Sequence, residues 1–446
     1  MLEKKGCHLG SLPPYVVNAT DSSDFQQTLA FAENNIMVII KNNGHSGVAR
    51  RTGFGSISIW THNLKQTVFH EKFQPSSCTI NSTWKGSQMA ITVGAGVQDG
   101  ELFKFAEKNN VVAVGGTNMD VGVVGWATGG GHGYLTGEFG MGADNILEAT
   151  IVTPNGDLLT ANACQNEDIY WAIRGGGGST FSVIVNMTMK AFPIPKMTLM
   201  GLNLVANEGT STKDWWKVVA KLHTLLPALQ DQGVTGYYTI GGPPSSETVS
   251  LAGSLFLWNA PNGTALNITS SIQQLFTENA AAVNGDEDLF AEVLMQVGTQ
   301  AAAPADGTPN PSMSGTMTIG HDPVDNALNP AWRKSVVHLI TSTSWPDSLP
   351  HEHVSQIVND VTYNKLNALR RLEPSTGAYL NEANAFESGW QWSFFGPNYG
   401  RLRTIKEKYD PEGLLWCPQC VGSEDWAQTE DGKLCKTYNV FATSQS

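Results

Sequence analysis

The sequence predicts an α+β protein with two domains. The chain has 446 residues, which is more than one compact core usually holds. Two segments near the N-terminus, 24–44 and 101–116, each show an amphipathic helix, then an apolar strand, then a glycine turn. From about 196 to 375 the pattern changes to alternating apolar runs and helices, which is typical of an antiparallel sheet flanked by helices. We therefore expect one domain at 1–195 and another at 196–375.

The remaining elements follow in order along the chain. Residues 147–153 and 158–160 are expected to form a β-hairpin around Pro-Asn-Gly156. Residues 183–191 form another strand, which ends at the breakers Pro193 and Pro195 and places the domain boundary there. In the second domain, strands are expected at 197–204 and 249–257, and a helix at 215–226.

Composition and charge exclude several classes of protein. The chain is 41% hydrophobic and 15% charged, and it has no apolar run long enough for a transmembrane helix. Its net charge of −13 argues against nucleic acid or an anionic membrane as a partner. Any phosphate bound here must therefore be held by local backbone N–H groups, which glycine-rich turns supply.

Cysteines and sequons favour a secreted or lumenal protein with disulfides, although Met1 to Gly6 is no signal peptide. Either a leader is missing from this chain or the protein is intracellular, and both remain open. The cysteines are Cys7, Cys78, Cys164, Cys417, Cys420 and Cys435, and the sequons begin at Asn18, Asn81, Asn186, Asn262 and Asn267.

Three glycine-dense turns are the main candidates for a binding site. Lys41-Asn-Asn-Gly-His45-Ser-Gly47 follows the expected strand at 36–40, and two further clusters lie at 125–133 and 175–178. A histidine beside glycine near a strand end is usually only a turn residue. Glycine clusters in apolar context, however, indicate close approach of backbone to a ligand. Together the three clusters indicate backbone wrapped around a large anionic ligand.

Other motifs are weaker. Gly94-Ala-Gly96-Val-Gln-Asp-Gly100 imitates a dinucleotide fingerprint, with Asp120 at the ribose position, but Asp99 and Glu101 in the first helical turn would repel a pyrophosphate. Cys417-Pro-Gln-Cys420 lacks the matching ligand pair of a zinc site and the βαβ unit of a thioredoxin site, so a structural disulfide is expected. No Walker motif, nucleophile elbow or paired metal-ligand cluster occurs, and His62 is expected to be a structural polar residue.

The order of these motifs resembles the FAD-linked oxidases of the berberine-bridge-enzyme-like group. The resemblance is carried by Gly44-His45, Val93-Gly-Ala-Gly96, Val121-Gly-Val123, the run to Gly133, Gly142-Ala-Asp144-Asn145, residues 166–178, and Phe395-Gly-Pro-Asn398-Tyr399. Ser58-Ile-Trp60-Thr-His62 and the segment 420–426 resemble its fungal isoamyl-alcohol-oxidase-like branch. The resemblance implies a PCMH-type FAD-binding fold, with 1–195 as FAD-binding domain, 196–375 as substrate-binding domain, and 376–446 returning to the FAD-binding domain.

The resemblance also implies the cofactor contacts. His45 matches the histidine that bonds to the flavin 8α-methyl carbon, and Asn118 stands where some relatives carry a second attachment cysteine, so one covalent bond to FAD is expected. Ala49-Arg50-Arg51 replaces the usual Gly-Arg-Ser, and Ser182 replaces a glycine. The remaining expected FAD contacts are Asn43, Gly44, Ser46, Gly47, Arg50, Gly116, Thr117, Gly122, Gly125, Gly129, Gly130, Gly131, His132, Gly133, Val183, Asn398 and Tyr399.

For catalysis, relatives often carry Tyr-x-Asn-Tyr-x-Asp, and this chain has Tyr379-Leu-Asn381-Glu382-Ala-Asn384. Tyr379, Asn381 and Glu382 are therefore the candidate catalytic residues, with the base left open among them. The expected activity is oxidation of an alcohol, amine or related small molecule in fungal secondary metabolism, by hydride transfer to flavin N5 and reoxidation by O₂. The alternatives are a flavin-retaining non-redox cyclase or pericyclase, and a flavoprotein without catalysis, the latter suggested by the altered loop and the late start of the chain.

Overall fold

The computed structural model describes residues 10–33, 36–79, 86–277, 286–304, 307–317, 320, 322–429 and 434–437. The chain divides into two compact units. Unit 1 comprises Pro195–Gly320 and Lys334–Thr376. Unit 2 comprises the described residues up to Ile194, the segment up to Arg333 that follows residue 321, and those from Gly377 onward.

Unit 2 begins with a parallel sheet of three strands in the order β1-β3-β2, namely Tyr15–Asn18, Ile57–Trp60 and Val38–Lys41. Helix α1 (Ser22–Ala32) begins at an Asp21 N-cap, whose side chain accepts from the N–H groups of Ser23 and Asp24. The apolar face of α1, with Phe25 and Leu29, packs against this sheet. The predicted first helix and strand are therefore confirmed, and the turn at His45 directly follows β2.

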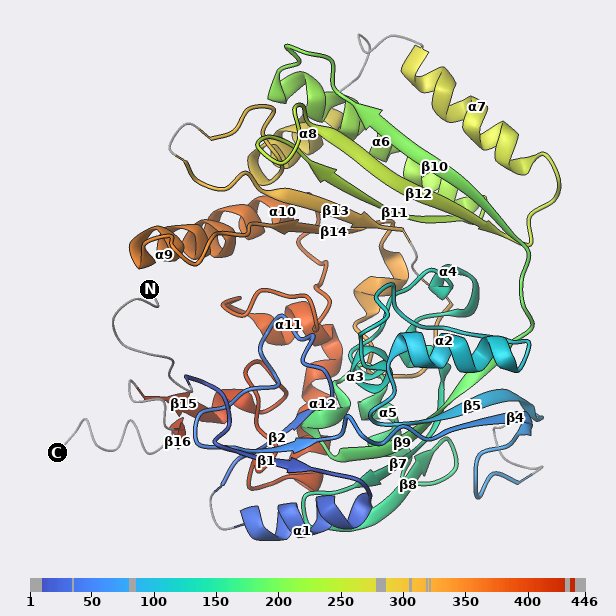
Figure 1. Cartoon of the computed structure of the whole chain (residues 1–446), viewed down its shortest axis with the longest axis vertical. Helices are drawn as coiled ribbons and strands as arrows, with labels where there is room; N and C mark the ends of the chain where they lie inside the picture. The colour runs from blue at the N-terminus through green and yellow to red at the C-terminus, as the bar shows by residue number, and fades with distance from the viewer. Residues whose placement is uncertain are drawn as a thin grey trace. The chain divides into compact units, whose positions relative to one another are not determined.

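The second sheet of unit 2 is antiparallel, in the order β4-β5-β9-β7-β8, with β6 beside β9 (Figure 1). The predicted hairpin is confirmed, because β7 and β8 pair with Val152 opposite Leu158. The strands are β4 (Thr67–Phe73), β5 (Gln88–Gly94), β6 (Val112–Ala113), β7 (Ile146–Val152), β8 (Leu158–Asn162) and β9 (Val183–Phe192). Helices α2 (Asp99–Lys108), α3 (Val123–Thr128), α4 (Thr136–Phe139) and α5 (Glu167–Ile173) connect them.

The sheet order removes the dinucleotide-binding alternative. Strand β5, which precedes the Gly94–Gly100 motif, lies antiparallel to both of its neighbours, β4 and β9. A dinucleotide fingerprint belongs to a parallel βαβ unit, which is absent at this position. The glycines here serve close packing instead, because a Cβ on Gly96 would lie 2.3 Å from the carbonyl oxygen of His62.

The C-terminal segment completes unit 2 with α11 (Trp390–Phe395), α12 (Tyr399–Tyr409) and the hairpin of β15 (Trp426–Gln428) and β16 (Leu434–Lys436). Phe395 and Leu402 are fully buried in the same core as the antiparallel sheet. The ammonium group of Lys406 is buried as well and donates to Asp410 and to the carbonyl of Thr180 at 2.7 Å. These contacts join residues more than 200 positions apart in sequence into one core.

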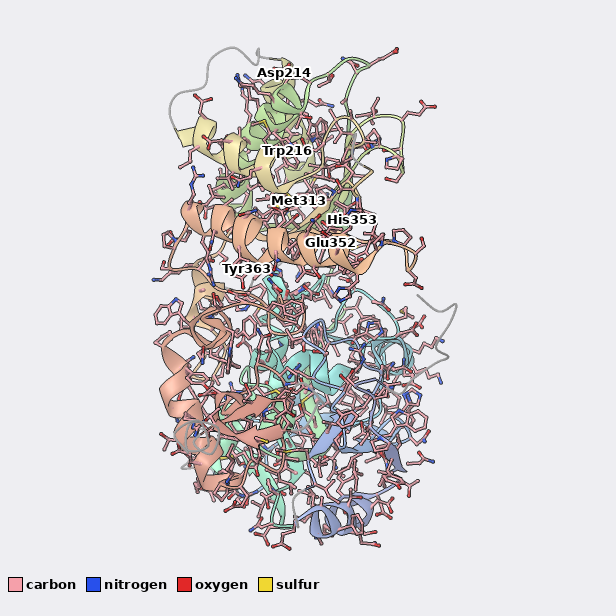
Figure 2. All side chains as sticks on the ribbon, turned by 90° about the vertical axis from the view of Figure 1, so that its left-hand side faces the viewer. Asp214, Trp216, Met313, Glu352, His353 and Tyr363 are labelled. Carbon is pink, nitrogen blue, oxygen red and sulfur yellow. A yellow bond between two sulfur atoms is a disulfide. The ribbon has the colours of Figure 1, made fainter. Side chains whose placement is uncertain are left out.

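Unit 1 is a five-stranded antiparallel sheet in the order β10-β12-β11-β13-β14, as the alternating pattern predicts. Helices α6 and α8 cover one face, where Trp216 and Met313 are buried, whereas Glu352, His353 and Tyr363 project from the segment α9–α10 (Figure 2). The strands are β10 (Met197–Val205), β11 (Val234–Gly241), β12 (Ser250–Trp258), β13 (Ser312–Thr316) and β14 (His338–Ser342). The helices are α6 (Thr212–Asp231), α7 (Thr264–Thr277), α8 (Asp286–Val297), α9 (His351–Asn359) and α10 (Leu366–Leu372), the last two joined by a π-helical turn, Asp360–Lys365.

Among the described residues two disulfides form, Cys78–Cys164 and Cys417–Cys420, whose pairing the sequence left open; they agree with the expected structural disulfide and with an oxidising environment. Cys435 forms no disulfide with any other described cysteine, whereas Cys7 and the sequon at Asn81 lie outside the described residues. No helix in the described ranges is long and apolar enough to cross a membrane.

Candidate active site

A cavity of about 310 Å³ in unit 2 brings most of the predicted site residues together. Its walls come mainly from the turn after β2, the loop before α3, α3 itself, and a turn at 379–382. Fourteen predicted residues line it: Asn43, Gly44, His45, Ser46, Arg50, Gly116, Thr117, Asn118, Gly122, Gly125, His132, Tyr379, Asn381 and Glu382.

The turn after β2 presents an exposed His45 to this cavity. Gly44 has a φ of +91°, which a glycine adopts without strain, and a Cβ there would lie 2.4 Å from Cδ of Arg51. The Arg51 guanidinium donates to the carbonyl of Ser46 at 2.9 Å, and Gly47 N–H donates to the carbonyl of Asn381 at 2.7 Å. These bonds hold the backbone that follows His45 in one conformation.

His62 supports the same turn. Its Nδ1 lies 3.2 Å from Oδ1 of Asn42 and 3.1 Å from Oδ1 of Asn43, and its ring stacks on Trp60. Desolvation lowers the pKa of His62, so the neutral imidazole that can donate to these amides is favoured. Asn43 also donates through its amide to the carbonyl of Asp120, which connects the turn to the opposite loop.

Arg50 is a buried cation on the cavity wall. Its guanidinium donates to Oδ1 of Asn381 and to Oγ of Ser46, the latter at 3.4 Å. Within the described part of the chain no carboxylate forms an ion pair with it. Burial lowers the pKa of Arg50 to about 10, because the charged form loses its hydration without gaining an anion.

The glycine run before Gly133 packs mainly on protein. A Cβ on Gly133 would lie 1.7 Å from the carbonyl oxygen of Gly115, and one on Gly129 would lie 2.5 Å from Nδ2 of Asn381. Cβ atoms on Gly130 and Gly131 would likewise meet Leu328 and the Trp126 ring at 2.9 Å. Gly125 is different, because it lines the cavity and a Cβ there would meet no protein atom within 4 Å.

Residues 379–382 form a turn, closed by Glu382 N–H donating to the Tyr379 carbonyl at 2.9 Å. The buried Tyr379 hydroxyl donates to the carbonyl of Trp126 at 3.2 Å and accepts from the Asn381 amide at 2.7 Å. Burial, and then the charge of Glu382, raise the pKa of Tyr379 well above its usual value. The phenol is therefore held protonated at neutral pH, which does not suit a proton acceptor.

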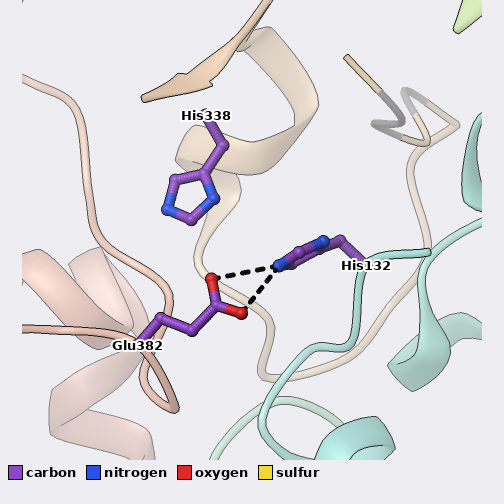
Figure 3. A group of neighbouring side chains, drawn as sticks. All are labelled: His132, His338 and Glu382. Carbon is purple, nitrogen blue, oxygen red and sulfur yellow. Dashed lines mark hydrogen bonds and ion pairs between the residues drawn. The ribbon is translucent and has the colours of Figure 1, made fainter. Parts of the chain in front are cut away.

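Glu382 is the exposed member of this turn and lies against His132 (Figure 3). Oε2 and Oε1 of Glu382 lie 3.1 and 3.3 Å from Nε2 of the buried His132. The carbonyl of His132 accepts from the indole N–H of Trp126 at 2.9 Å, which fixes the backbone from which the imidazole projects. A carboxylate and an imidazole in contact at a cavity wall can together accept and hold a proton.

Some predicted residues lie away from the cavity. Val183 is fully buried at the start of β9 and pairs with Val152, whereas Asn398 donates to the carbonyl of Leu328 at 3.0 Å. The Tyr399 hydroxyl donates to Glu424. Gly47, Gly129, Gly130, Gly131 and Gly133 do not line the cavity, although their packing shapes its wall.

The structure adds lining residues that the motifs did not reveal. Lys41 and Arg51 flank the His45 turn, so with Arg50 three cations line one wall of a cavity in a chain of net charge −13. Their closeness to His45 in sequence could have suggested them. Ser179 and Trp126 also line the cavity. Trp126 lies within the predicted glycine cluster 125–133 and Ser179 directly follows the cluster 175–178, so the clusters indicated their neighbourhood although not the two residues themselves.

Comparison with known proteins shows the family to which the chain belongs. Residues 13–162 match a family model described as FAD binding domain, and residues 378–422 match one described as berberine and berberine like. The chain is 34% identical over 467 residues to the FAD-linked oxidoreductase sor8 of Hypocrea jecorina, covering 96% of this chain and 78% of that protein. It is 32% identical over 476 residues to the FAD-linked oxidoreductase patO of Aspergillus clavatus, covering 97% and 80%.

Solved structures show the same fold. The VAO-type flavoprotein MtVAO713 of Myceliophthora thermophila C1 superposes with a TM-score of 0.87 at 29% identity, over 97% of this chain and 84% of that chain. Berberine bridge enzyme from Eschscholzia californica superposes with a TM-score of 0.69 at 17% identity, over 92% and 90%. The second likeness concerns the fold alone.

Proposed function

Because the chain belongs to the berberine-bridge-enzyme-like family of FAD-linked oxidoreductases, we propose that it oxidises a small alcohol, amine or related organic molecule in fungal secondary metabolism. The observation that carries the proposal is the meeting of His45, the buried Arg50 and the His132–Glu382 pair on one cavity. The first two suit an anionic, tethered cofactor, and the third suits the removal of a substrate proton.

The cavity residues fit FAD. Arg50 is buried on the wall without a carboxylate partner in the described chain, and a pyrophosphate would supply the missing anion. Gly125 leaves open space where any side chain would protrude, which suits close approach of a planar ring. Asn43, Ser46, Thr117 and Asn118 add polar groups along the same wall.

Bound FAD would supply the hydride acceptor and, through O₂, the route to H₂O₂. Glu382 accepts the proton of the substrate hydroxyl or amine, and His132 Nε2, at 3.1 Å, is placed to share that proton. Tyr379 has an orienting role instead: its hydroxyl accepts from the Asn381 amide at 2.7 Å, and this bond holds both side chains of the turn in place. This assignment narrows the candidate base from three residues to Glu382.

Stopped-flow mixing with a panel of small alcohols and amines under anaerobic conditions tests the reaction. We expect a substrate that bleaches the flavin band near 450 nm, with the rate of bleaching about 10²- to 10⁴-fold lower in Glu382→Gln and far less affected in Tyr379→Phe. Conversion of a substrate without bleaching would favour the flavin-retaining cyclase. Unchanged bleaching in Glu382→Gln would exclude Glu382 as base.

His45 is proposed as the one covalent tether of FAD, with Asn118 on the wall where a second attachment would need a thiol. Acid-denatured protein should therefore remain yellow, and His45→Ala should release its flavin. His70→Ala is the matched control, because His70 lies on β4 and bonds to Thr92 outside the cavity. Flavin that washes out of the acid-denatured parent would contradict the tether.

A further inference from the structure

The carboxyl group of Asp99 lies directly behind the cavity wall. Asp99 is the first residue of α2 and is 0% exposed. Its Oδ2 accepts from Gly116 N–H at 3.1 Å, and Gly116 lines the cavity. Its Oδ1 is also buried and has no hydrogen-bond partner among the described residues. A buried carboxyl with one oxygen unsatisfied is costly, so its place at this wall needs an explanation.

The start of α2 and the loop before α3 are closely joined. Asp99 N–H donates to the Val121 carbonyl and Gly100 N–H to the Met119 carbonyl, each at 2.9 Å. There is no spare room between the two segments, because a Cβ on Gly116 would lie 2.7 Å from Oδ2 of Asp99. The carboxyl group therefore backs the cavity wall at Gly116, and Thr117 and Asn118, which follow Gly116, also line the cavity.

We propose that Asp99 is a positioning residue for FAD, whose buried carboxyl group holds the Gly116 N–H and so fixes the 116–118 wall in the form that receives the cofactor. The inference rests on the placement of FAD in this cavity. Asp99 acts through Gly116 and touches neither FAD nor substrate.

The protonation of the Asp99 carboxyl group predicts how FAD affinity changes with pH. Burial raises the pKa of the Asp99 carboxyl to about 7, opposed by the Gly116 hydrogen bond. The charged groups on the elements around it are Glu101, Lys104, Glu107 and Lys108 on α2, Lys65, which bonds to Glu101, and Asp120 on the loop. FAD would cover the wall and add negative charge, which raises the pKa of Asp99 further. Binding then takes up a proton, and FAD affinity falls as pH rises through 7.

Titration of deflavinated full-length protein with FAD tests this, in a His45→Ala background that keeps binding reversible. The parent should bind FAD at least threefold more weakly at pH 8 than at pH 6. Asp99→Asn keeps an oxygen that can accept from Gly116 and should bind as tightly as the parent at pH 6, with no loss at pH 8. Asp99→Leu removes the acceptor and should bind at least tenfold more weakly at both values.

Two results would overturn the proposal: parental affinity in Asp99→Leu, or the parental pH dependence in Asp99→Asn. Thermal unfolding of each apoprotein shows whether Asp99→Leu folds. If it does not fold, the pH dependence of FAD affinity in Asp99→Asn decides the question. Gly125→Val distinguishes failure of the FAD placement from failure of the Asp99 role, because its side chain would enter the cavity without meeting protein. Normal FAD affinity in Gly125→Val would place FAD elsewhere and remove both proposals, whereas weak affinity there with normal affinity in Asp99→Leu would remove only the role of Asp99.

Discussion

Replacing Arg50 with methionine should stabilise the apoprotein and weaken its response to FAD. Burial lowers the pKa of Arg50 to about 10, which is more than about two pH units below that of a free guanidinium. At about 1.4 kcal/mol per pH unit, holding this charge costs the fold roughly 3 kcal/mol. Because the folded pKa lies below the unfolded value, the cost is present at every pH below about 10. Methionine fills similar space without charge, so the apoprotein should gain up to about 3 kcal/mol, less the lost bonds to Asn381 and Ser46.

The assay is urea unfolding of deflavinated protein at pH 7.5, with and without FAD, in the His45→Ala background. In the parent, FAD supplies the anion that Arg50 lacks. The stabilisation by FAD should therefore be larger in the parent than in Arg50→Met, by an amount similar to the stability gained by the Arg50→Met apoprotein. Arg51→Met is the matched control for apoprotein stability, because Arg51 is only half-buried. Its free energy of unfolding without FAD should stay within about 1 kcal/mol of the parent. An Arg50→Met apoprotein less stable than the parent, with an equal response to FAD, would refute the reasoning.

Three further outcomes concern the scaffold. Removing the Cys78–Cys164 disulfide with two serines should cost about 4 kcal/mol in chemical unfolding, since it closes a loop of 86 residues, and a loss below about 1 kcal/mol would contradict this. Burial lowers the pKa of His223 to about 4, so unit 1 should lose up to roughly 3 kcal/mol as pH falls from 6.5 to 4, and His223→Gln should abolish that slope. Gly133→Ala puts a Cβ 1.7 Å from the Gly115 carbonyl oxygen and should lower the melting temperature by several degrees, whereas an unchanged melting temperature would show that the loop yields freely.

Much of the fold could be predicted because its signals are local. The period-2 pattern of 197–204 and 249–257 gave two strands of an antiparallel sheet, and they pair with each other in full register. The α+β class and the VAO/PCMH-type fold are confirmed by the solved neighbours. Strand order was not accessible in the same way. Nothing in the Gly94–Gly100 motif shows that β5 lies between two antiparallel partners, and that pairing is what separates it from a dinucleotide-binding turn.

The candidate site was predictable in membership more than in mechanism. Glycine density predicts close approach of backbone to a ligand, and this stays a prediction, because the sequence does not say what approaches each glycine. At Gly129 and Gly133 the neighbour is protein, whereas at Gly125 it is open cavity. Asp99 shows the same limit. From the sequence, Asp99 is a carboxylate at a helix start that would repel phosphate. Its burial behind Gly116, which only the structure shows, is the basis for the positioning role proposed above.

The glycine residues at the cavity wall and the turn at 379–382 are packed against each other. Asn381 lies more than 250 residues beyond Gly125 in sequence, yet its amide donates to the carbonyl of Gly125 at 3.2 Å and its backbone carbonyl accepts from Gly47. A side chain at Gly47 or Gly129 would occupy the space that this turn fills. The glycines therefore admit the turn, and the turn then brings Glu382 to His132. Because the proposed base Glu382 and the proposed tether His45 are held by the same contacts, enlarging Gly47 or Gly129 should impair flavin attachment and proton removal together.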